Sequence, residues 1–232
     1  MKSFILYEIG KDTTMKKITE DHFEAFVDAC HEVAAQGLVR CSSGNISWRI
    51  NEDYMLITAT SAWMANITKE HIALIRISDR AILNDEKPSS ESGFHLGIMQ
   101  NRPDVNVILH FQSPNATALA CCAKDLTNFY IIPEIPYYIG EISVLPYLDP
   151  GSKNLAEAVI SAIEKHDLVT LKNHGQVTVG KSFDDVIQKA TFFELACDIL
   201  LRMGNLPIQF ISTSAINKLR LSSSKKYLKT IK

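Results

Sequence analysis

The sequence of 232 residues lacks the features of a secreted, membrane or disulfide-rich protein. It has no run of about twenty apolar residues that could cross a bilayer. The apolar run near its start is too short for a signal peptide and has no small-residue cleavage site. Its five cysteines are odd in number and form no C-x-x-C pair, which indicates reduced thiols. These absences predict a soluble, cytoplasmic protein.

A strong excess of charge of one sign is also missing. The sequence has 24 Lys and Arg against 26 Asp and Glu, for a formal net charge of -2. Nucleic-acid-binding proteins usually carry a dense basic stripe, and here the only basic run is the short end SKKYLKTIK. We interpret that end as a solvated tail and expect neither nucleic acid nor a membrane as a partner.

The hydrophobic content of 46% is enough to bury one large core without disulfides. Strand and helix patterns alternate, and no linker or repeat divides them. The sequence therefore predicts one α/β domain with a central, largely antiparallel sheet covered by helices. It spans residues 17–215, between an N-terminal extension (1–16) and a C-terminal segment with the basic tail (216–232). Strands are predicted at 45–50, 54–60, 72–77, 105–111 and, as a hairpin, 168–180; helices are predicted after the caps Thr19, Ser90, Ser113 and Ser182.

Three hydroxyl-rich stretches interrupt these patterns: SSGNIS (42–47), TATS (58–61) and KPSSE (87–91). Gly44 frees the backbone to turn, so that amides and the Asn45 side chain can converge on an anion. The third stretch precedes a helix, whose N-terminal N–H groups suit phosphate. Each stretch alone is more typical of a turn or a cap than of a phosphate site. The three together favour a phosphate pocket.

His110 ends the strand 105–111, and Gln112 follows two positions later on the same face. A lone histidine in an apolar strand is more often a core residue than a metal ligand. His174, in the turn of the second hairpin, could complete a metal cluster with these two residues. Glu91 is a candidate proton carrier, although a glutamate at the start of a helix also complements the helix dipole. Spacing alone leaves both interpretations open.

The order of the motifs SSGNIS, TATS, PSSE…H…RPDVNVILHFQSP and NHG resembles the class II aldolase/adducin family, in particular its L-fuculose-1-phosphate aldolase branch. The resemblance runs from the first helix to the closing helix. It implies a three-layer α/β/α fold and a homotetramer with active sites at subunit interfaces. It also implies Zn²⁺ held by three histidines, two of them from an H-x-H strand.

Matched residue by residue, the resemblance makes His110 and His174 metal ligands and puts Gln112 in place of the second strand histidine. A carboxamide is a weaker zinc donor than imidazole, so Mn²⁺ or Mg²⁺ are alternatives to Zn²⁺. Glu91 matches the acid/base, and Tyr137 matches a proton donor that reaches into a neighbouring subunit's site. The positions that match the phosphate-binding residues are Gly44, Asn45, Thr60, Ser61, Ser89 and Ser90.

The function implied is a metal-dependent aldolase that cleaves a ketose 1-phosphate, similar to L-fuculose 1-phosphate, into dihydroxyacetone phosphate and a short aldehyde. The bound metal would stabilise the enediolate left by the cleavage. Two alternatives stay open. One is a sugar-phosphate epimerase or dehydratase on the same scaffold, and the other is a non-catalytic family member, because Gln112 replaces a ligand histidine.

Overall fold

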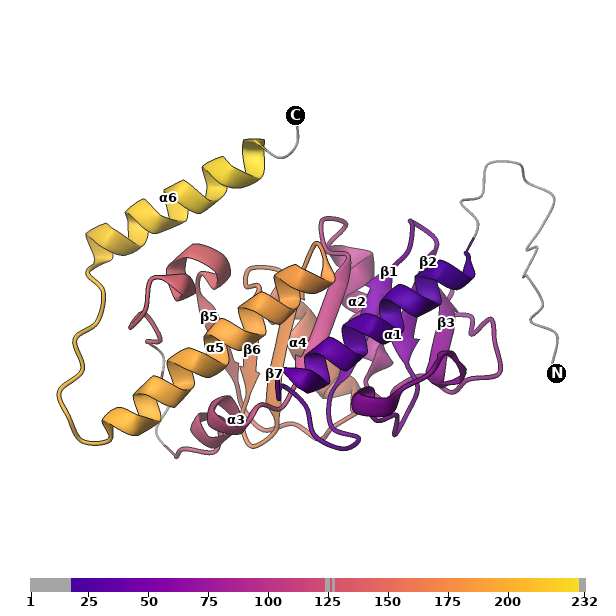
Figure 1. Ribbon diagram of the computed structural model, residues 1–232, viewed down its shortest axis with the longest axis horizontal. Coiled ribbons are helices and arrows are strands. Elements are labelled where there is room, and N and C mark those ends of the chain that lie inside the picture. Colours follow the sequence, from indigo (N-terminus) through magenta and orange to yellow (C-terminus); the bar gives the residue numbers. More distant parts are fainter. Residues whose placement is uncertain (1–17, 124–125, 127, 230–232) are drawn as a thin grey trace.

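The protein is described by a computed structural model that covers residues 18–123, 126 and 128–229, with only the backbone of 224–229 (Figure 1). The predicted N-terminal extension, 1–16, lies outside the described residues. Seven strands form one sheet in the order β3-β2-β1-β4-β7-β6-β5. The strands are β1 (Asn45–Arg49), β2 (Tyr54–Thr58), β3 (Ile72–Arg76), β4 (Val107–Phe111), β5 (Ile142–Leu145), β6 (Leu168–Leu171) and β7 (Gly175–Gly180).

All neighbouring strands are antiparallel except β5 and β6, which are parallel. The predicted antiparallel sheet is therefore confirmed. β5 was not expected from the sequence; its four residues are all half-buried. A half-buried edge strand lacks the continuous apolar run that marks the central strands.

Helices cover both faces of the sheet and give three layers (Figure 1). One face is covered by α1 (Glu20–Ala35), α3 (Pro114–Ala120) and α5 (Phe183–Met203), and the other by α2 (Ser92–Asn101) and α4 (Lys153–Ile163). Helix α6 (Thr213–Lys229) packs beside the π-helical turn η3 (Ile135–Ile139) and continues across position 216, where the sequence placed the C-terminal segment. Two short 3-10 turns, η1 (Met64–Asn66) and η2 (Lys69–His71), connect β2 to β3.

The predicted caps hold at three of the four helices. Thr19, Ser113 and Ser182 are the N-caps of α1, α3 and α5. Helix α2 differs, because it begins at Ser92 and Glu91, not Ser90, takes the cap position. The Ser89 hydroxyl accepts a hydrogen bond from the Glu91 backbone N–H at 3.2 Å, so the turn before the helix ends later than predicted. Glu91 is thereby placed at the end of a turn and is 7% exposed.

Alternation along β4 determines where His110 points. Val107, Leu109 and Phe111 belong to the core under α1, α3 and α5, whereas Ile108 belongs to the core under α2 and α4. His110 therefore faces the α2 side of the sheet. Its ring meets the Phe94 ring of α2 edge-on, with centroids 6.2 Å apart.

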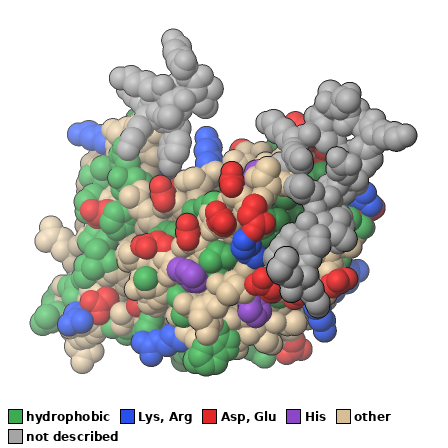
Figure 2. Space-filling view, turned by 45° about the vertical axis from the view of Figure 1, so that its right-hand side comes forward, with side chains coloured by type: hydrophobic (Ala, Val, Ile, Leu, Met, Phe, Trp, Pro, Cys, Tyr) green, Lys and Arg blue, Asp and Glu red, His purple; other side chains and the backbone are tan. Residues whose placement is uncertain are grey.

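Among the described helices, none combines the length and the apolar character needed to span a membrane. Figure 2 shows acidic side chains in a row across one face of the molecule, with Lys and Arg scattered singly around them. Acidic side chains thus gather on this face, with basic side chains at its margins.

Candidate active site

A cavity of about 250 Å³ lies where β1, β4 and β7 meet the loop before α2. It is lined by Ser42, Ser43, Gly44, Asn45, Ala59, Thr60, Ser61, Ala62, Ser89, Ser90, Glu91, His110, Gln112, Pro150 and His174. All three hydroxyl-rich stretches therefore meet both histidines and Glu91 in one place. Of the site residues predicted from the sequence, only Tyr137 is not among the described residues that line it.

Two glycines allow the chain to come this close. Gly44 has φ +75°, and a Cβ there would lie 2.6 Å from the His110 carbonyl oxygen. Gly175, directly after His174, would place a Cβ 2.6 Å from the Phe111 carbonyl oxygen and 3.1 Å from His110 Cε1. Any side chain at either position would push the loops away from β4. The glycines in SSGNIS and NHG are thus explained by close approach to His110.

Glu91, His110 and His174 form what we call the metal triad. One ligand atom from each lies within 4.8 Å of the others. His110 Nε2 is 3.3 Å from Glu91 Oε2, and His174 Nε2 is 3.6 Å from Glu91 Oε1. The two imidazole rings meet edge-on at a centroid distance of 4.8 Å. The three side chains come from three segments that are far apart in the sequence.

Hydrogen bonding prepares His110 for metal binding. His110 Nδ1 donates to the Gln176 backbone carbonyl at 2.9 Å. A carbonyl can only accept, so Nδ1 carries a proton, and in the neutral form of the ring the Nε2 lone pair faces the triad. Burial, and then the neighbouring His110 ring, lower the pKa of His174. A histidine ring whose pKa is lowered stays neutral at neutral pH, and the neutral ring is the form that binds metal.

The triad fits a divalent metal ion. Glu91 Oε1 and His174 Nδ1 are both buried, and neither has a hydrogen-bond partner among the described residues. Buried polar atoms are normally paired, so an unpartnered carboxylate oxygen beside two imidazoles indicates that a further group belongs there. Two nitrogens and a carboxylate oxygen are the donor set of many catalytic zinc sites.

Comparison with known proteins identifies the family of the chain. Residues 24–201 match the model of the class II aldolase and adducin N-terminal domain. The chain belongs to the class II aldolase and adducin family. The resemblance seen in the sequence is thereby confirmed.

Individual members of the family support the assignment. The chain is 33% identical over 181 residues to an L-fuculose phosphate aldolase of Methanococcus maripaludis, covering 78% of this chain and 96% of the relative. It is 28% identical over 188 residues to a 3-oxo-tetronate 4-phosphate decarboxylase of Escherichia coli, covering 80% and 88%. A solved L-fuculose 1-phosphate aldolase has the same fold, with a TM-score of 0.81 at 22% identity, covering 89% of this chain and 98% of that one.

Gln112, which stands where the family resemblance implies a ligand histidine, makes a hydrogen bond within the chain. Its side-chain Nε2 donates to the His174 backbone carbonyl at 2.8 Å while the residue lines the cavity. Because the amide nitrogen is used in this way, Gln112 holds the turn that carries His174. The sequence offered Gln112 as a ligand, and the structure gives it this supporting contact.

The hydroxyl residues lie around the mouth of the cavity. Thr60, Ser61 and Ser90 are exposed, whereas Ser89 is buried and its hydroxyl caps the Glu91 N–H. Ser61 has φ +62°, in the left-handed region that favours glycine. Glycine adopts this conformation without strain, so Ser61 is held here by its surroundings.

Sequence reasoning missed the function of one histidine. His95 is fully buried on α2, and it hydrogen-bonds to Ser47 Oγ at 2.7 Å and to Asn45 Oδ1 at 2.5 Å. Asn45 Nδ2 in turn donates to Glu91 Oε2 at 2.9 Å. The available signal was spacing, since His95 follows Glu91 by four residues and so lies near it on one helical face. Asn45, expected to bind phosphate, has both ends of its carboxamide engaged by these neighbours.

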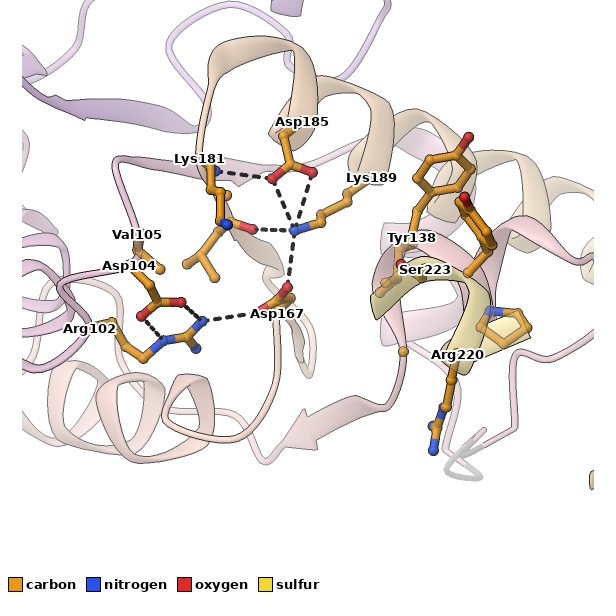
Figure 3. A pocket seen from close by; sticks show the side chains of 16 residues that line it. Arg102, Asp104, Val105, Tyr138, Asp167, Lys181, Asp185, Lys189, Arg220 and Ser223 are labelled. Atoms are coloured by element: carbon orange, nitrogen blue, oxygen red, sulfur yellow. Dashed lines mark hydrogen bonds and ion pairs between the residues drawn. The ribbon is translucent and has the colours of Figure 1, made fainter. Parts of the chain in front are cut away.

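Tyr137 lies elsewhere in its own chain. It lines a second cavity, of about 420 Å³, together with Tyr138, Arg102, Lys189 and Arg220 (Figure 3). That cavity lies at the Val107–Gly180 end of the paired strands β4 and β7, whereas the metal triad lies near the Phe111–Gln176 end. A single chain therefore does not bring Tyr137 to the triad.

Proposed function

We propose that the protein is a metal-dependent lyase that breaks a carbon–carbon bond in a small phosphorylated sugar or sugar acid and releases dihydroxyacetone phosphate. The observation that carries this proposal is the single cavity in which the metal triad lies beside three hydroxyl-rich loops. Such a cavity can hold a phosphate at its mouth and a carbonyl group at its floor. Family membership and the names of the relatives support the same reaction class.

The two substrates suggested by the relatives converge on one intermediate. Cleavage of the C3–C4 bond of a ketulose 1-phosphate leaves its electron pair on C3, as the enediolate of dihydroxyacetone phosphate. Loss of CO₂ from C1 of a 3-oxo-tetronate 4-phosphate leaves its electron pair on C2 and gives the same enediolate. A divalent metal in the triad would act as a Lewis acid that favours this charge.

The residues of the chain supply the remaining steps. Glu91, whose Oε2 accepts from Asn45, would take a proton from water and deliver it to the enediolate carbon to complete dihydroxyacetone phosphate. Thr60, Ser61 and Ser90, with the backbone of Gly44, would hold the phosphate so that the reacting carbon stays near Glu91. His110 and His174 would hold the metal.

The two reactions differ in one proton. Aldol cleavage must also remove the hydroxyl proton from the carbon that becomes the aldehyde, whereas decarboxylation needs no such group. Among the described residues that line the cavity, only Glu91, His110 and His174 have titratable side chains. Because decarboxylation needs no further group to remove a hydroxyl proton, this observation favours decarboxylation as the second candidate function. For aldol cleavage we propose that Tyr137 of the partner subunit supplies the missing group in a homotetramer, as the family resemblance implies.

One assay tests both reactions. Protein loaded with Zn²⁺ or Mn²⁺ is given L-fuculose 1-phosphate or 3-oxo-tetronate 4-phosphate, and dihydroxyacetone phosphate is measured by coupled NADH oxidation. We expect release from at least one substrate, with Glu91→Gln inactive on both. Tyr137→Phe should lower aldol cleavage by at least about tenfold and leave decarboxylation unchanged. If neither substrate yields the product in metal-loaded protein, the lyase proposal is wrong and the epimerase, dehydratase and non-catalytic alternatives regain weight.

A further inference from the structure

A buried chain of hydrogen bonds joins Ser47 to the metal triad. It runs from Ser47 Oγ to His95 Nδ1 at 2.7 Å, from His95 Nε2 to Asn45 Oδ1 at 2.5 Å, and from Asn45 Nδ2 to Glu91 Oε2 at 2.9 Å. All four residues are at most 7% exposed, and Ser47 and His95 are fully buried. Ser47 and His95 do not line the cavity. Their polar side chains therefore need an explanation other than contact with substrate.

The direction of each hydrogen bond follows from the groups involved. A carboxylate only accepts, so the Asn45 NH₂ group must face Glu91 and its carbonyl oxygen must face His95. His95 Nε2 must then carry a proton to donate. Burial holds the pKa of His95 well below its usual value, so the ring is neutral and Nδ1 carries no proton. The Ser47 hydroxyl therefore donates to Nδ1.

Every donor in the chain thus points toward Glu91. Hydrogen bonds aligned in this way polarise one another and strengthen the last bond of the series, which is the one to the carboxylate. Without His95, the Asn45 carboxamide could rotate and turn its carbonyl oxygen toward Glu91, which would repel the carboxylate. The tautomer of His95 prevents that rotation.

From this geometry we infer that Ser47 and His95 are positioning residues, which act through Asn45 to fix the Glu91 carboxylate in the orientation that binds the metal and moves the proton. The spacing of these residues along β1 and at the start of α2 brings their side chains together. Asn45 and Ser47 are two apart on β1 and share a face, and Glu91 and His95 are four apart at the start of α2. The inference rests on the proposed function for its kinetic test and on the triad alone for its metal-binding test.

Four variants test the inference. His95→Leu removes both hydrogen bonds of the ring, and His95→Gln can restore an N–H toward Asn45. Ser47→Ala removes the first donor. The matched control is Thr178→Val, which removes another fully buried hydroxyl. This hydroxyl donates to the Asp167 backbone carbonyl at 2.9 Å, and Thr178 does not line the cavity. Each variant is measured for melting temperature, for the Kd of Zn²⁺ or Mn²⁺ by calorimetry, for inhibition by inorganic phosphate and for kcat.

We expect His95→Leu to raise the metal Kd by about tenfold and to lower kcat by at least about as much, because supporting partners of metal ligands have effects of this size. The inhibition constant of phosphate should stay within about twofold, since the hydroxyl loops are intact. His95→Gln should recover most of both losses, and Ser47→Ala should show a smaller change of about three- to fivefold in the same direction. Thr178→Val should change only the melting temperature.

The inference is overturned if all three variants, Ser47→Ala, His95→Gln and His95→Leu, fold and keep both the metal Kd and kcat within about twofold of wild type. It is equally overturned if Thr178→Val matches their losses, because the effect would then be general destabilisation. Should His95→Leu fail to fold, the comparison of Ser47→Ala with Thr178→Val decides. Failure of the proposed function is seen separately, as wild-type protein that binds metal and releases no dihydroxyacetone phosphate.

Discussion

Polar and charged groups gather at both ends of the β4–β7 pair. At one end they form a candidate metal site, and at the other they pair with one another. At one end, in the metal triad, a buried carboxylate faces two imidazoles, and its Oε1 has no hydrogen-bond partner in the described part of the chain. At the other end lies a charged cluster of Arg102, Asp104, Asp167, Asp185 and Lys189 (Figure 3).

In the charged cluster each group has an opposite charge beside it. Arg102 lies 2.7 Å from Asp104 and 3.3 Å from Asp167, and Lys189 lies 3.0 Å from Asp167 and 3.4 Å from Asp185. Lys189 also donates to the Val179 carbonyl at 2.9 Å. Arg102, hydrogen-bonded to Asp104, holds the pKa of that carboxyl below its usual value. Such mutual pairing satisfies buried charge and joins α2, α5 and the sheet.

Whether the polar groups satisfy one another, more than the size of the cavity, distinguishes a functional site from a structural junction. The cavity beside the charged cluster is the larger, at about 420 Å³ against about 250 Å³. Yet its charged groups satisfy one another, whereas the triad holds donor atoms that converge and remain unsatisfied. Removing a residue should therefore affect stability at one end and chemistry at the other.

The largest expected effect is at the triad. His110→Ala should remove a metal ligand and lower kcat for dihydroxyacetone phosphate release by roughly a thousandfold or more, because the charge on the enediolate loses its stabiliser. Metal content after purification without chelator, measured by mass spectrometry, should fall with it. The folded protein should persist, since the change relieves a crowded polar site. Full metal content in the variant would show that His110 is a core histidine.

The charged cluster should respond to Lys189→Met in the opposite way. Lys189 is 4% exposed at its side chain, and its loss removes the cation that Asp167 and Asp185 share, although Asp167 keeps its ion pair with Arg102. Breaking a buried pair from one side should lower the free energy of unfolding by about 3 kcal/mol in urea denaturation, with metal content unchanged.

A matched control for Lys189 is available on α4. Lys153→Met breaks an ion pair with Glu157 whose lysine side chain is 87% exposed. An exposed i,i+4 pair contributes little, so this change should stay below about 0.5 kcal/mol. Equal effects of the two substitutions would erase the distinction between the two ends of the sheet.

A smaller effect than that of His110→Ala is expected at Gln112, at the same end of the sheet. Gln112→His should tighten Zn²⁺ binding by about tenfold, because imidazole is a better zinc donor than a carboxamide. It also removes the hydrogen bond to the His174 carbonyl, so kcat can move in either direction. Competition with a chelating dye measures the affinity. An unchanged Kd for Zn²⁺ would mean that the side chain at position 112 does not face the metal.

Local pattern determined much of the protein. The apolar and β-branched residues of β1, β2, β3 and β4, and the caps Thr19, Ser113 and Ser182, are short-range properties of the chain, so the antiparallel sheet and the starts of α1, α3 and α5 were predictable. So was membership of the family, because its motifs occur in order along the sequence. The glycines of SSGNIS and NHG could be seen, although the close approach that requires them could not.

Only the tertiary structure decided how the site works, because the residues that line it lie up to 132 positions apart, from Ser42 to His174. Strand pairing sets Asn45 opposite His110, and helix α2 adds Glu91 and His95 from the same side. From the sequence we expected Asn45 to bind phosphate and assigned no role to His95. The hydrogen-bond partners of a side chain depend on which residues pack against it, and the sequence does not show that. The same holds for Gln112, which the fold turns toward the His174 carbonyl, and for Lys189, whose charge is satisfied by residues that only packing brings near.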